Sequence, residues 1–139
     1  MYPAEITAPM AAQLANAGFE ELKTPAAVDE VLSQQSGTTL LVVNSVCGCA
    51  AGSARPGILA SLQGDFQPDR KVTVFAGVDI EATKKAREYL LPYPPSSPSV
   101  ALFKDGQLVH IIERHHIEAR HPALIAANLQ AAYQEYCKD

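Results

Sequence analysis

The sequence has no tryptophan, few charged residues and no apolar run that approaches the length of a membrane helix. Its 139 residues are 47% apolar and 19% charged, whereas a membrane-spanning helix needs about 20 mostly apolar residues in a row. The first ten residues contain no lysine or arginine, unlike a secretory signal. We therefore expect one domain over residues 1–139, in a soluble, cytoplasmic protein with no membrane partner.

Positive charge is also scarce and is not concentrated in any segment. The formal net charge is −4, and the isoelectric point is near 5.5. Proteins that bind nucleic acid or anionic membranes usually gather lysine and arginine into a patch. The composition therefore argues against a nucleic-acid partner.

Cysteine is rare, but two of the three cysteines, Cys47 and Cys49, are separated by a single residue. Small secreted scaffolds usually carry an even set of four or more cysteines. In a reducing compartment, a close pair favours redox or metal chemistry over structural crosslinking. The third cysteine, Cys137, lies two residues from the end of the chain, and we expect it to be inert.

Apolar periodicity predicts an α/β protein with three layers. Helices are predicted over residues 8–17, 25–34, 50–63, 81–90 and 122–136, and strands over 19–23, 38–44, 72–78, 100–103 and 108–112. Alternating strands and helices favour a mostly parallel central sheet. Asp105-Gly106 between the last two strands predicts an antiparallel hairpin. We therefore expect a mixed sheet covered by helices on both faces, with an extra helix at the N-terminus.

Local signals predict where helices begin or break. Thr24 is suited to cap a helix whose first residue is Pro25, and Asp79 is placed to cap the helix over 81–90. Pro56 has no backbone N–H and should kink the helix over 50–63. The proline-rich residues 91–98 predict a loop.

Cys47 follows a predicted buried strand and precedes a predicted helix. Chemistry in open α/β sheets gathers at this carboxyl edge of the strands. Free backbone N–H groups and the positive end of the helix dipole stabilise a thiolate, so the pKa of Cys47 should lie below that of a free thiol. Arg55 is a candidate for further positive charge. The pattern predicts a nucleophile for disulfide sulfur.

The single residue between the two cysteines limits how they can pair. Side chains at positions i and i+2 of a helix point in different directions, so a Cys47–Cys49 disulfide needs Gly48 in a non-helical conformation, which glycine permits. The small ring would be strained, and strained disulfides are easily reduced. The spacing favours a transient, catalytic disulfide over a structural one.

Two other interpretations of the pair stay open. Cys47 and Cys49 are small enough to be packing residues at a strand end. A metal site would need further ligands, which four histidines could supply. These histidines are His110, His115, His116 and His121. Because His115 and His116 are adjacent, we expect their rings to face apart, and we expect no metal.

The order of elements from about residue 19 to 112 resembles the thioredoxin fold. In that fold the cysteines begin the helix after the second strand, and Pro56 stands where the family kinks this helix. Ser97-Pro98 precedes a predicted strand, where the family places a cis-proline that faces the cysteines. Pro98 is therefore a candidate cis-proline.

A closer resemblance is to the bacilliredoxins, thioredoxin-like proteins with a C-G-C centre. It is carried by residues 44–52 (NSVCGCAAG), 54–56 (ARP), 75–79 (FAGVD), 97–99 (SPS) and 112–115 (IERH). The resemblance covers nearly the whole chain. It implies reduction of mixed disulfides between protein cysteines and bacillithiol, a low-molecular-weight thiol, with no bound cofactor. Disulfide isomerase activity is also associated with this family.

The resemblance implies that Cys47 attacks the mixed disulfide and that Cys49 or another thiol resolves the adduct. Gly48, Ser97, Pro98 and Arg55 would shape the site. Val46 stands where thioredoxins have tryptophan, and Leu41 where they have a buried acid. Both differences favour monothiol chemistry or isomerisation over dithiol reduction. The alternative function is a non-catalytic redox-sensing or binding module on the same fold.

Overall fold

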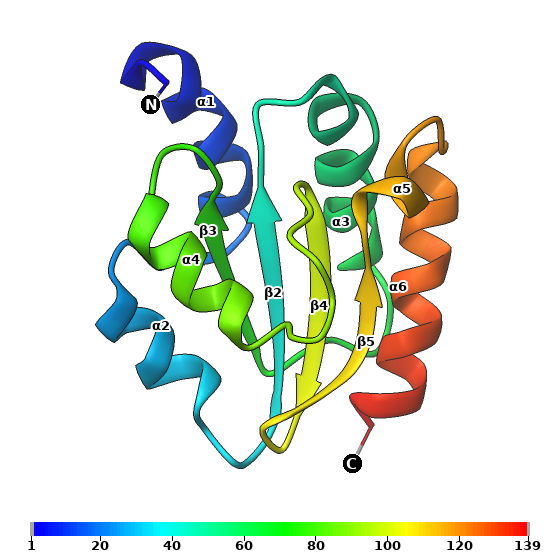
Figure 1. Cartoon of the computed structure of the whole chain (residues 1–139). Helices are drawn as coiled ribbons and strands as arrows, with labels where there is room; N and C mark the ends of the chain where they lie inside the picture. The colour runs from blue at the N-terminus through cyan, green and yellow to red at the C-terminus, as the bar shows by residue number, and fades with distance from the viewer. Residues whose placement is uncertain (1, 139) are drawn as a thin grey trace.

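A mixed five-stranded sheet runs through the centre of the computed structural model, which describes residues 2–138 (Figure 1). The strands are β1 (Glu20–Glu21), β2 (Thr38–Asn44), β3 (Arg70–Phe75), β4 (Ser99–Lys104) and β5 (Gln107–Ile112). Their spatial order is β1-β3-β2-β4-β5. β3 pairs in parallel with β1 and β2, β4 is antiparallel to β2, and β5 is antiparallel to β4. The predicted mixed sheet is confirmed.

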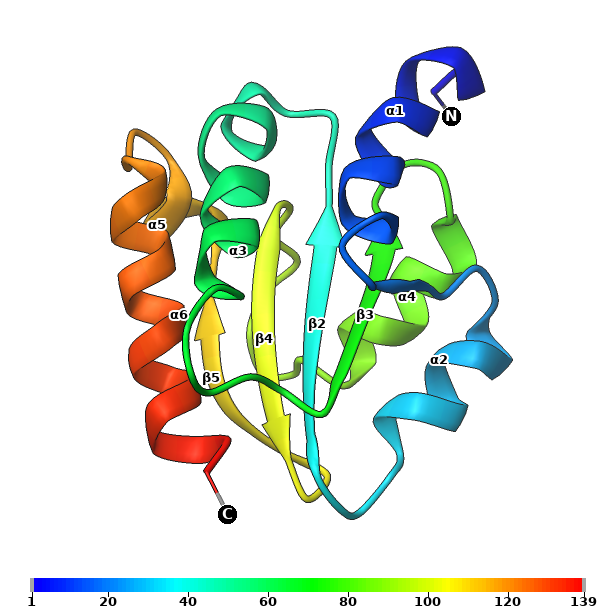
Figure 2. The ribbon, with the colours of Figure 1, turned by 180° about the vertical axis from the view of Figure 1, so that it is seen from behind.

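Helices cover both faces of the sheet. They are α1 (Ala4–Ala15), α2 (Pro25–Leu32), η1 (Ala50–Ala54), α3 (Arg55–Ser61), α4 (Ile80–Glu88), α5 (Arg114–Ile117) and α6 (Pro122–Tyr136). α2 and α4 cover one face, while α1, α3 and α6 cover the other (Figures 1 and 2). Between residues 2 and 138, no helix has the length and apolar character needed to cross a bilayer. The predicted three layers and the extra N-terminal helix are confirmed.

The central strand β2 is buried along its whole length. Leu40 and Val42 pack with α1, α3 and α6, whereas Leu41 and Val43 pack with α2 and α4. Side chains alternate between the two faces of a strand, so β2 contributes to both halves of the core. Full burial of each such side chain contributes about 1.5–3 kcal/mol. The buried strand β2 therefore fixes the position of the residues that follow it.

The hairpin between β4 and β5 has the predicted turn. Asp105 and Gly106 have φ angles of 52° and 81°. Two consecutive positive φ angles are typical of the type I′ turn that Asp-Gly favours. The Thr24 cap is also confirmed, since its hydroxyl accepts a hydrogen bond from the N–H of Ala27 at 3.1 Å.

The strand predicted over residues 72–78 ends earlier than its apolar run suggests. β3 stops at Phe75, whose carbonyl oxygen accepts hydrogen bonds from the N–H groups of Val78 and Asp79 at 3.1 and 2.9 Å. Gly77 has a φ of +84°, which turns the chain out of the sheet. Asp79 occupies the predicted N-cap position of α4, but its side chain makes no capping hydrogen bond.

The helix predicted over residues 50–63 divides into two parts. The first is the five-residue π-helical segment η1, in which the N–H of Arg55 bonds to the carbonyl oxygen of Ala50. α3 then begins with Pro56 in its first turn. Because Pro56 has no N–H to donate, the ladder of helical hydrogen bonds is interrupted here. The irregularity predicted from Pro56 is present, but it is a π-helical turn before the proline.

Candidate active site

Cys47 lies just beyond the carboxyl end of β2. The chain leaves the sheet at Asn44, and the N–H of Ala50 already bonds to the carbonyl oxygen of Cys47 at 2.9 Å. The N–H of Cys47 donates to Ser45 Oγ at 3.1 Å, which orders the short loop. Cys47 and Cys49 are both free thiols and both half-buried. The structure thus places the pair at the predicted junction between strand and helix.

The surroundings of Cys47 lower the pKa of its thiol. Burial acts to raise the pKa, but a hydrogen bond from the Cys49 thiol, backbone N–H groups of Cys49 and Ala50, and the charge of Arg114 outweigh it. The N–H of Cys49 lies 3.3 Å from Cys47 Sγ. Groups that donate to the thiolate stabilise it over the thiol. The lowered pKa agrees with the predicted direction, and backbone amides contribute to it as predicted, but the largest lowering contribution is the hydrogen bond from the Cys49 thiol.

The pKa of Cys49 is shifted in the opposite direction. Burial raises it, and the hydrogen bond that its thiol donates to Cys47, together with the negative charge there, raises it further. Of the two thiols, Cys47 is therefore the more acidic and loses its proton first as the pH rises. The pair consists of a nucleophile and a less acidic neighbour that donates a hydrogen bond to it.

Gly48 has a helical backbone in this structure. It is not among the residues with positive φ, and a Cβ atom added to it would meet no other atom within 4 Å. Neither space nor backbone conformation requires glycine while the two thiols are free. A disulfide between Cys47 and Cys49 still needs Gly48 to leave this helical geometry.

Arg55 is not the cation beside Cys47, which corrects the prediction from sequence. Its side chain is only 2% exposed, and burial lowers the pKa of its guanidinium. It donates to Gln13 Oε1 at 2.7 Å, to Asn44 Oδ1 at 2.9 Å and to the carbonyl oxygen of Ser45 at 2.9 Å. Arg55 therefore affects the site from within the core, where it holds the loop that carries Cys47.

The charge that acts on Cys47 belongs to Arg114, which the sequence analysis did not single out. Arg114 is exposed in α5, and its Nε donates to Glu118 Oε1 at 2.6 Å. Its backbone N–H donates to Ser96 Oγ at 2.7 Å. α5 follows β5, which runs in the same direction as β2, so both strands end at the same edge of the sheet. That topology was the available signal.

Ser97 and Pro98 differ in their relation to the site. The Ser97–Pro98 peptide bond is cis, as predicted, and so is Leu91–Pro92. Ser97 lines the hollow that contains Cys47. Pro98 is buried next to the first residue of β4 and does not line this hollow.

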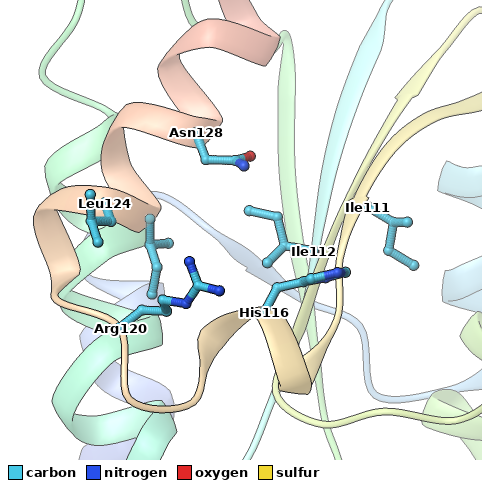
Figure 3. A pocket seen from close by; sticks show the side chains of 7 residues that line it. Ile111, Ile112, His116, Arg120, Leu124 and Asn128 are labelled. Atoms are coloured by element: carbon cyan, nitrogen blue, oxygen red, sulfur yellow. The ribbon is translucent and has the colours of Figure 1, made fainter.

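Another pocket lies between β5, α5 and α6, and it contains no cysteine (Figure 3). Isoleucine and leucine side chains form its apolar wall, with His116, Arg120 and Asn128 at its polar positions. Asn128 Oδ1 lies 2.7 Å from His110 Nε2. This pocket is separate from the hollow at Cys47.

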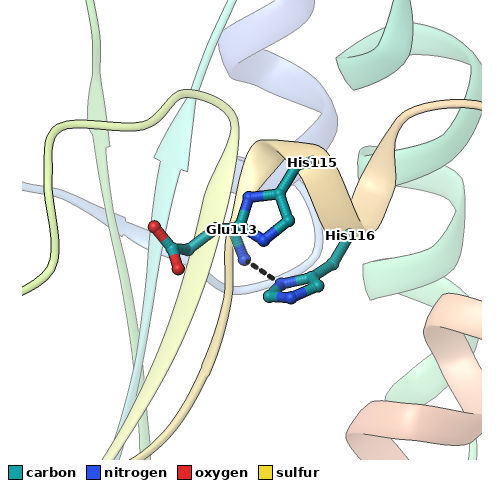
Figure 4. A group of neighbouring side chains, drawn as sticks. All are labelled: Glu113, His115 and His116. Carbon is teal, nitrogen blue, oxygen red and sulfur yellow. Dashed lines mark hydrogen bonds between the residues drawn. The ribbon is translucent and has the colours of Figure 1, made fainter.

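His115 and His116 lie together rather than facing apart, which corrects a second prediction. Their ring centroids are 3.9 Å apart, and Glu113 lies beside them (Figure 4). His116 Nδ1 already accepts the N–H of Glu113 at 3.1 Å, and the Glu113 side chain caps the backbone of His116. These groups serve as helix caps. Within residues 2–138, the group of neighbouring potential metal ligands includes no cysteine.

Cys137 lies at the opposite end of β2 from the other two cysteines. Its N–H donates to the carbonyl oxygen of Tyr133 at 2.7 Å, and its side chain packs on the core. Burial raises the pKa of its thiol, and a hydrogen bond with Thr38, the first residue of β2, only partly offsets this. Cys137 therefore cannot form a disulfide with Cys47 or Cys49 of the same chain.

Comparison with known proteins identifies close relatives by sequence. A family model described as disulphide isomerase matches residues 2–137. The chain is 60% identical over 135 residues to a bacilliredoxin of Cytophaga hutchinsonii, which covers 97% of this chain and 99% of that protein. It is 52% identical over 137 residues to a bacilliredoxin of Halalkalibacterium halodurans, which covers 99% of this chain and 95% of that protein.

Solved structures share the fold at much lower identity. Oxidised mitochondrial thioredoxin 3 of Saccharomyces cerevisiae aligns with a TM-score of 0.57 and 17% identity, covering 84% of this chain and 94% of that one. A mutant thioredoxin of Halobacterium salinarum aligns with a TM-score of 0.59 and 18% identity, covering 88% and 94%. These matches confirm the thioredoxin-like architecture.

Proposed function

Because the chain belongs to the bacilliredoxin family and has the thioredoxin fold, we propose that it is a cytoplasmic thiol–disulfide oxidoreductase. Its substrates would be mixed disulfides between protein cysteines and a low-molecular-weight thiol of the bacillithiol type. The observation that carries the proposal is the geometry of the pair, two free thiols at the junction of β2 and the helix start, with the N–H of Cys49 3.3 Å from Cys47 Sγ. The pKa of Cys47 is lowered and that of Cys49 is raised, in keeping with this geometry. A lowered pKa increases the thiolate fraction, and the thiolate is the attacking species.

In the first step the Cys47 thiolate attacks the small-thiol sulfur of the mixed disulfide. A new disulfide forms between Cys47 Sγ and the small thiol, and the original sulfur–sulfur bond breaks. The protein cysteine leaves as a thiolate and takes a proton from water. The N–H groups of Cys49 and Ala50 and the charge of Arg114 stabilise the attacking thiolate.

In the second step Cys49 resolves the adduct. Its thiol loses a proton to water, and the resulting thiolate attacks Cys47 Sγ. The Cys47–Cys49 disulfide forms, the bond between Cys47 and the small thiol breaks, and the small thiol leaves as a thiolate that is protonated from water. The substrate cysteine is then reduced and the pair is oxidised by two electrons, which a thiol reductant of the cell returns. A second small thiol could resolve the adduct instead, leaving Cys49 reduced.

The other predicted site residues support this chemistry without a bound cofactor, since sulfur carries the electrons. Arg55 holds the loop of Cys47 through Asn44 and Ser45. Ser97 lines the same hollow as Cys47 and is joined to Pro98 by the cis peptide bond. Gly48 gives the pair the freedom to close. The same exchange could take place on a disulfide within a protein. If that substrate is released before Cys49 attacks, the result is disulfide isomerase activity.

The test is multiple turnover on a defined mixed disulfide. A peptide cysteine joined to bacillithiol is incubated with a hundredth of an equivalent of protein and an excess of free small thiol, and peptide release is followed by mass spectrometry. We expect many cycles for each protein molecule, well above the rate without protein. In the Cys49→Ser variant, incubated with the mixed disulfide and no free small thiol, we expect a Cys47 adduct to accumulate. A single stoichiometric oxidation without turnover would instead support the redox-sensing module.

A further inference from the structure

A second arginine shares the hollow of Cys47. Arg87 comes from α4, on the opposite face of the sheet from α3, and it lines this hollow together with Ser97 and Arg114. The same three residues also line the adjoining hollow, so the two form one continuous groove. No aspartate or glutamate from residues 2–138 lines the part that contains Cys47, whereas Glu113 and Glu118 line the adjoining part.

Arg87 has no partner for its side chain among residues 2–138. Its Nε is buried without a hydrogen bond, and it takes part in no ion pair. Lys85, two residues earlier on α4, shows the usual arrangement, with Asp29 at 3.7 Å and Glu88 at 3.4 Å. Burial lowers the pKa of the Arg87 guanidinium. Because a buried donor without a hydrogen bond is destabilising, such a group usually has a role.

Arg114 supplies a second guanidinium from another element. Its Nε is paired with Glu118, and its Nη1 reaches the carbonyl oxygen of Ser97 at 3.4 Å. The remaining guanidinium donors are available to the groove. Arginine binds carboxylates through two parallel hydrogen bonds, because the planar fork of the guanidinium matches the two oxygens.

We propose that Arg87 and Arg114 form a carboxylate subsite beside Cys47, which holds an anionic group of the substrate disulfide during attack. The inference rests on the proposed function, because it assumes that Cys47 attacks disulfides. The carboxylate could belong to the small thiol or to an acidic side chain next to the protein cysteine. Arg87 is the specificity-determining residue, since Arg114 also acts on the thiolate itself.

The first test compares an anionic with a neutral disulfide. Stopped-flow absorbance gives the rates at which Cys47 attacks 5,5′-dithiobis(2-nitrobenzoate) and 4,4′-dithiodipyridine, with Cys49 and Cys137 replaced by serine. We expect Arg87→Gln to lower the ratio of anionic to neutral rates by about tenfold or more. In Arg87→Lys the ratio of anionic to neutral rates should fall less than in Arg87→Gln. Lysine retains the positive charge but lacks the planar guanidinium that donates two parallel hydrogen bonds.

Matched controls separate this effect from a general loss of charge or structure. Lys84 is exposed on the same helix and does not line the groove, so Lys84→Gln should leave the ratio within about twofold. Circular dichroism reports whether each variant is folded, and the neutral disulfide reports any change in the reactivity of the Cys47 thiol itself. Arg114→Gln, at an exposed position, supplies a second variant whose ratio should also fall.

Four peptide mixed disulfides then identify where the carboxylate comes from. The small thiol is 3-mercaptopropionate or 2-mercaptoethanol, and the residue beside the peptide cysteine is aspartate or asparagine. If Arg87→Gln slows only the two disulfides that contain 3-mercaptopropionate, the subsite holds the carboxylate of the small thiol. If it slows only the two disulfides whose peptide contains aspartate, the subsite holds the carboxylate of the protein substrate.

Either result supports the subsite, whereas an equal loss with charged and neutral disulfides overturns it. A wild-type protein that attacks the neutral disulfide quickly, with an unchanged ratio in Arg87→Gln, would leave the proposed function standing and remove the subsite. A wild-type protein that attacks neither disulfide would remove the proposed function itself.

Discussion

Cys47 and Cys137 are the same kind of residue at opposite ends of one strand, but their thiols are shifted in opposite directions. Beyond the carboxyl end of β2, burial of Cys47 is outweighed by amide and thiol hydrogen bonds and by Arg114. Near the start of β2, burial dominates at Cys137. The comparison shows that the reactivity of a cysteine in this fold depends on the donors around it and on which edge of the sheet it occupies.

Removing each sulfur in turn gives the largest expected difference between the two cysteines. Cys47→Ser should lower turnover of a mixed disulfide by at least about a thousandfold, because no other thiol in the chain can replace the nucleophile. Cys137→Ser should change turnover by less than about twofold. Retained turnover in Cys47→Ser, with the protein shown to be folded, would assign the chemistry elsewhere.

The second comparison concerns an arginine at each end of β2. Arg55 is buried below the Cys47 loop, whereas Arg70 bonds to Thr39 and Ser36 near the surface. Arg55→Met leaves the buried carbonyl oxygen of Ser45 without its arginine donor and removes one of the two hydrogen bonds that Asn44 Oδ1 accepts. It should lower the free energy of unfolding by about 2–4 kcal/mol.

Arg70→Met should cost about 1 kcal/mol or less, because solvent can replace its hydrogen bonds. Urea unfolding followed by circular dichroism measures both values. Equal decreases in the free energy of unfolding for Arg55→Met and Arg70→Met would show that burial of Arg55 adds no further stability.

Alkylation by iodoacetamide as a function of pH tests the two thiols directly. Because the pKa of Cys47 is lowered and that of Cys137 is raised, Cys47 should reach half of its limiting rate at the lower pH. At pH 7 it should react severalfold faster, as read by peptide mass spectrometry on reduced protein.

Arg114→Gln should move the Cys47 profile to higher pH and leave that of Cys137 in place, since the arginine acts on the first thiol only. Coincident profiles for the two thiols in the wild-type protein would contradict the electrostatic account of the site.

The smallest expected effect concerns Gly48, which separates the reactive pair. Alanine fits the helical backbone seen here and favours it over glycine by about 1 kcal/mol, whereas the disulfide needs a non-helical backbone. Gly48→Ala should therefore destabilise the oxidised form relative to the reduced form and raise the reduction potential by about 20 mV.

Equilibration with glutathione redox buffers measures this potential. Gly52→Ala is the matched control, since it also lies in open space nearby but outside the pair. A similar shift in both variants would mean that helix propensity alone is responsible.

Local signals in the sequence were sufficient for much of the fold. The unbroken apolar run of residues 38–44 predicted the buried strand β2, and the Asp105-Gly106 turn predicted the hairpin. The apolar run of residues 72–78 was misleading, because Gly77 ends the strand through a backbone conformation that hydrophobicity does not report. The four-residue helix α5 is too short to give a periodic pattern.

The site was predictable only where it depends on neighbours along the chain. Cys47 and the amides at the helix start are close in sequence, so the direction of its pKa shift followed from the pattern. Arg114 reaches Cys47 through the packing of β5 beside β4, which sequence spacing does not show. Arg55 is near in sequence, yet whether its guanidinium faces solvent or the core depends on tertiary partners such as Gln13.

Because Arg55 is buried and Arg114 is exposed, the position of the Cys47 loop and the acidity of the Cys47 thiol are controlled separately. Arg55 sets the position of the loop from inside the core, while Arg114 sets part of the acidity of Cys47 from an exposed helix. Surface substitutions at Arg114 and Glu118 therefore offer a way to tune the thiol in small increments while the scaffold beneath it stays unchanged.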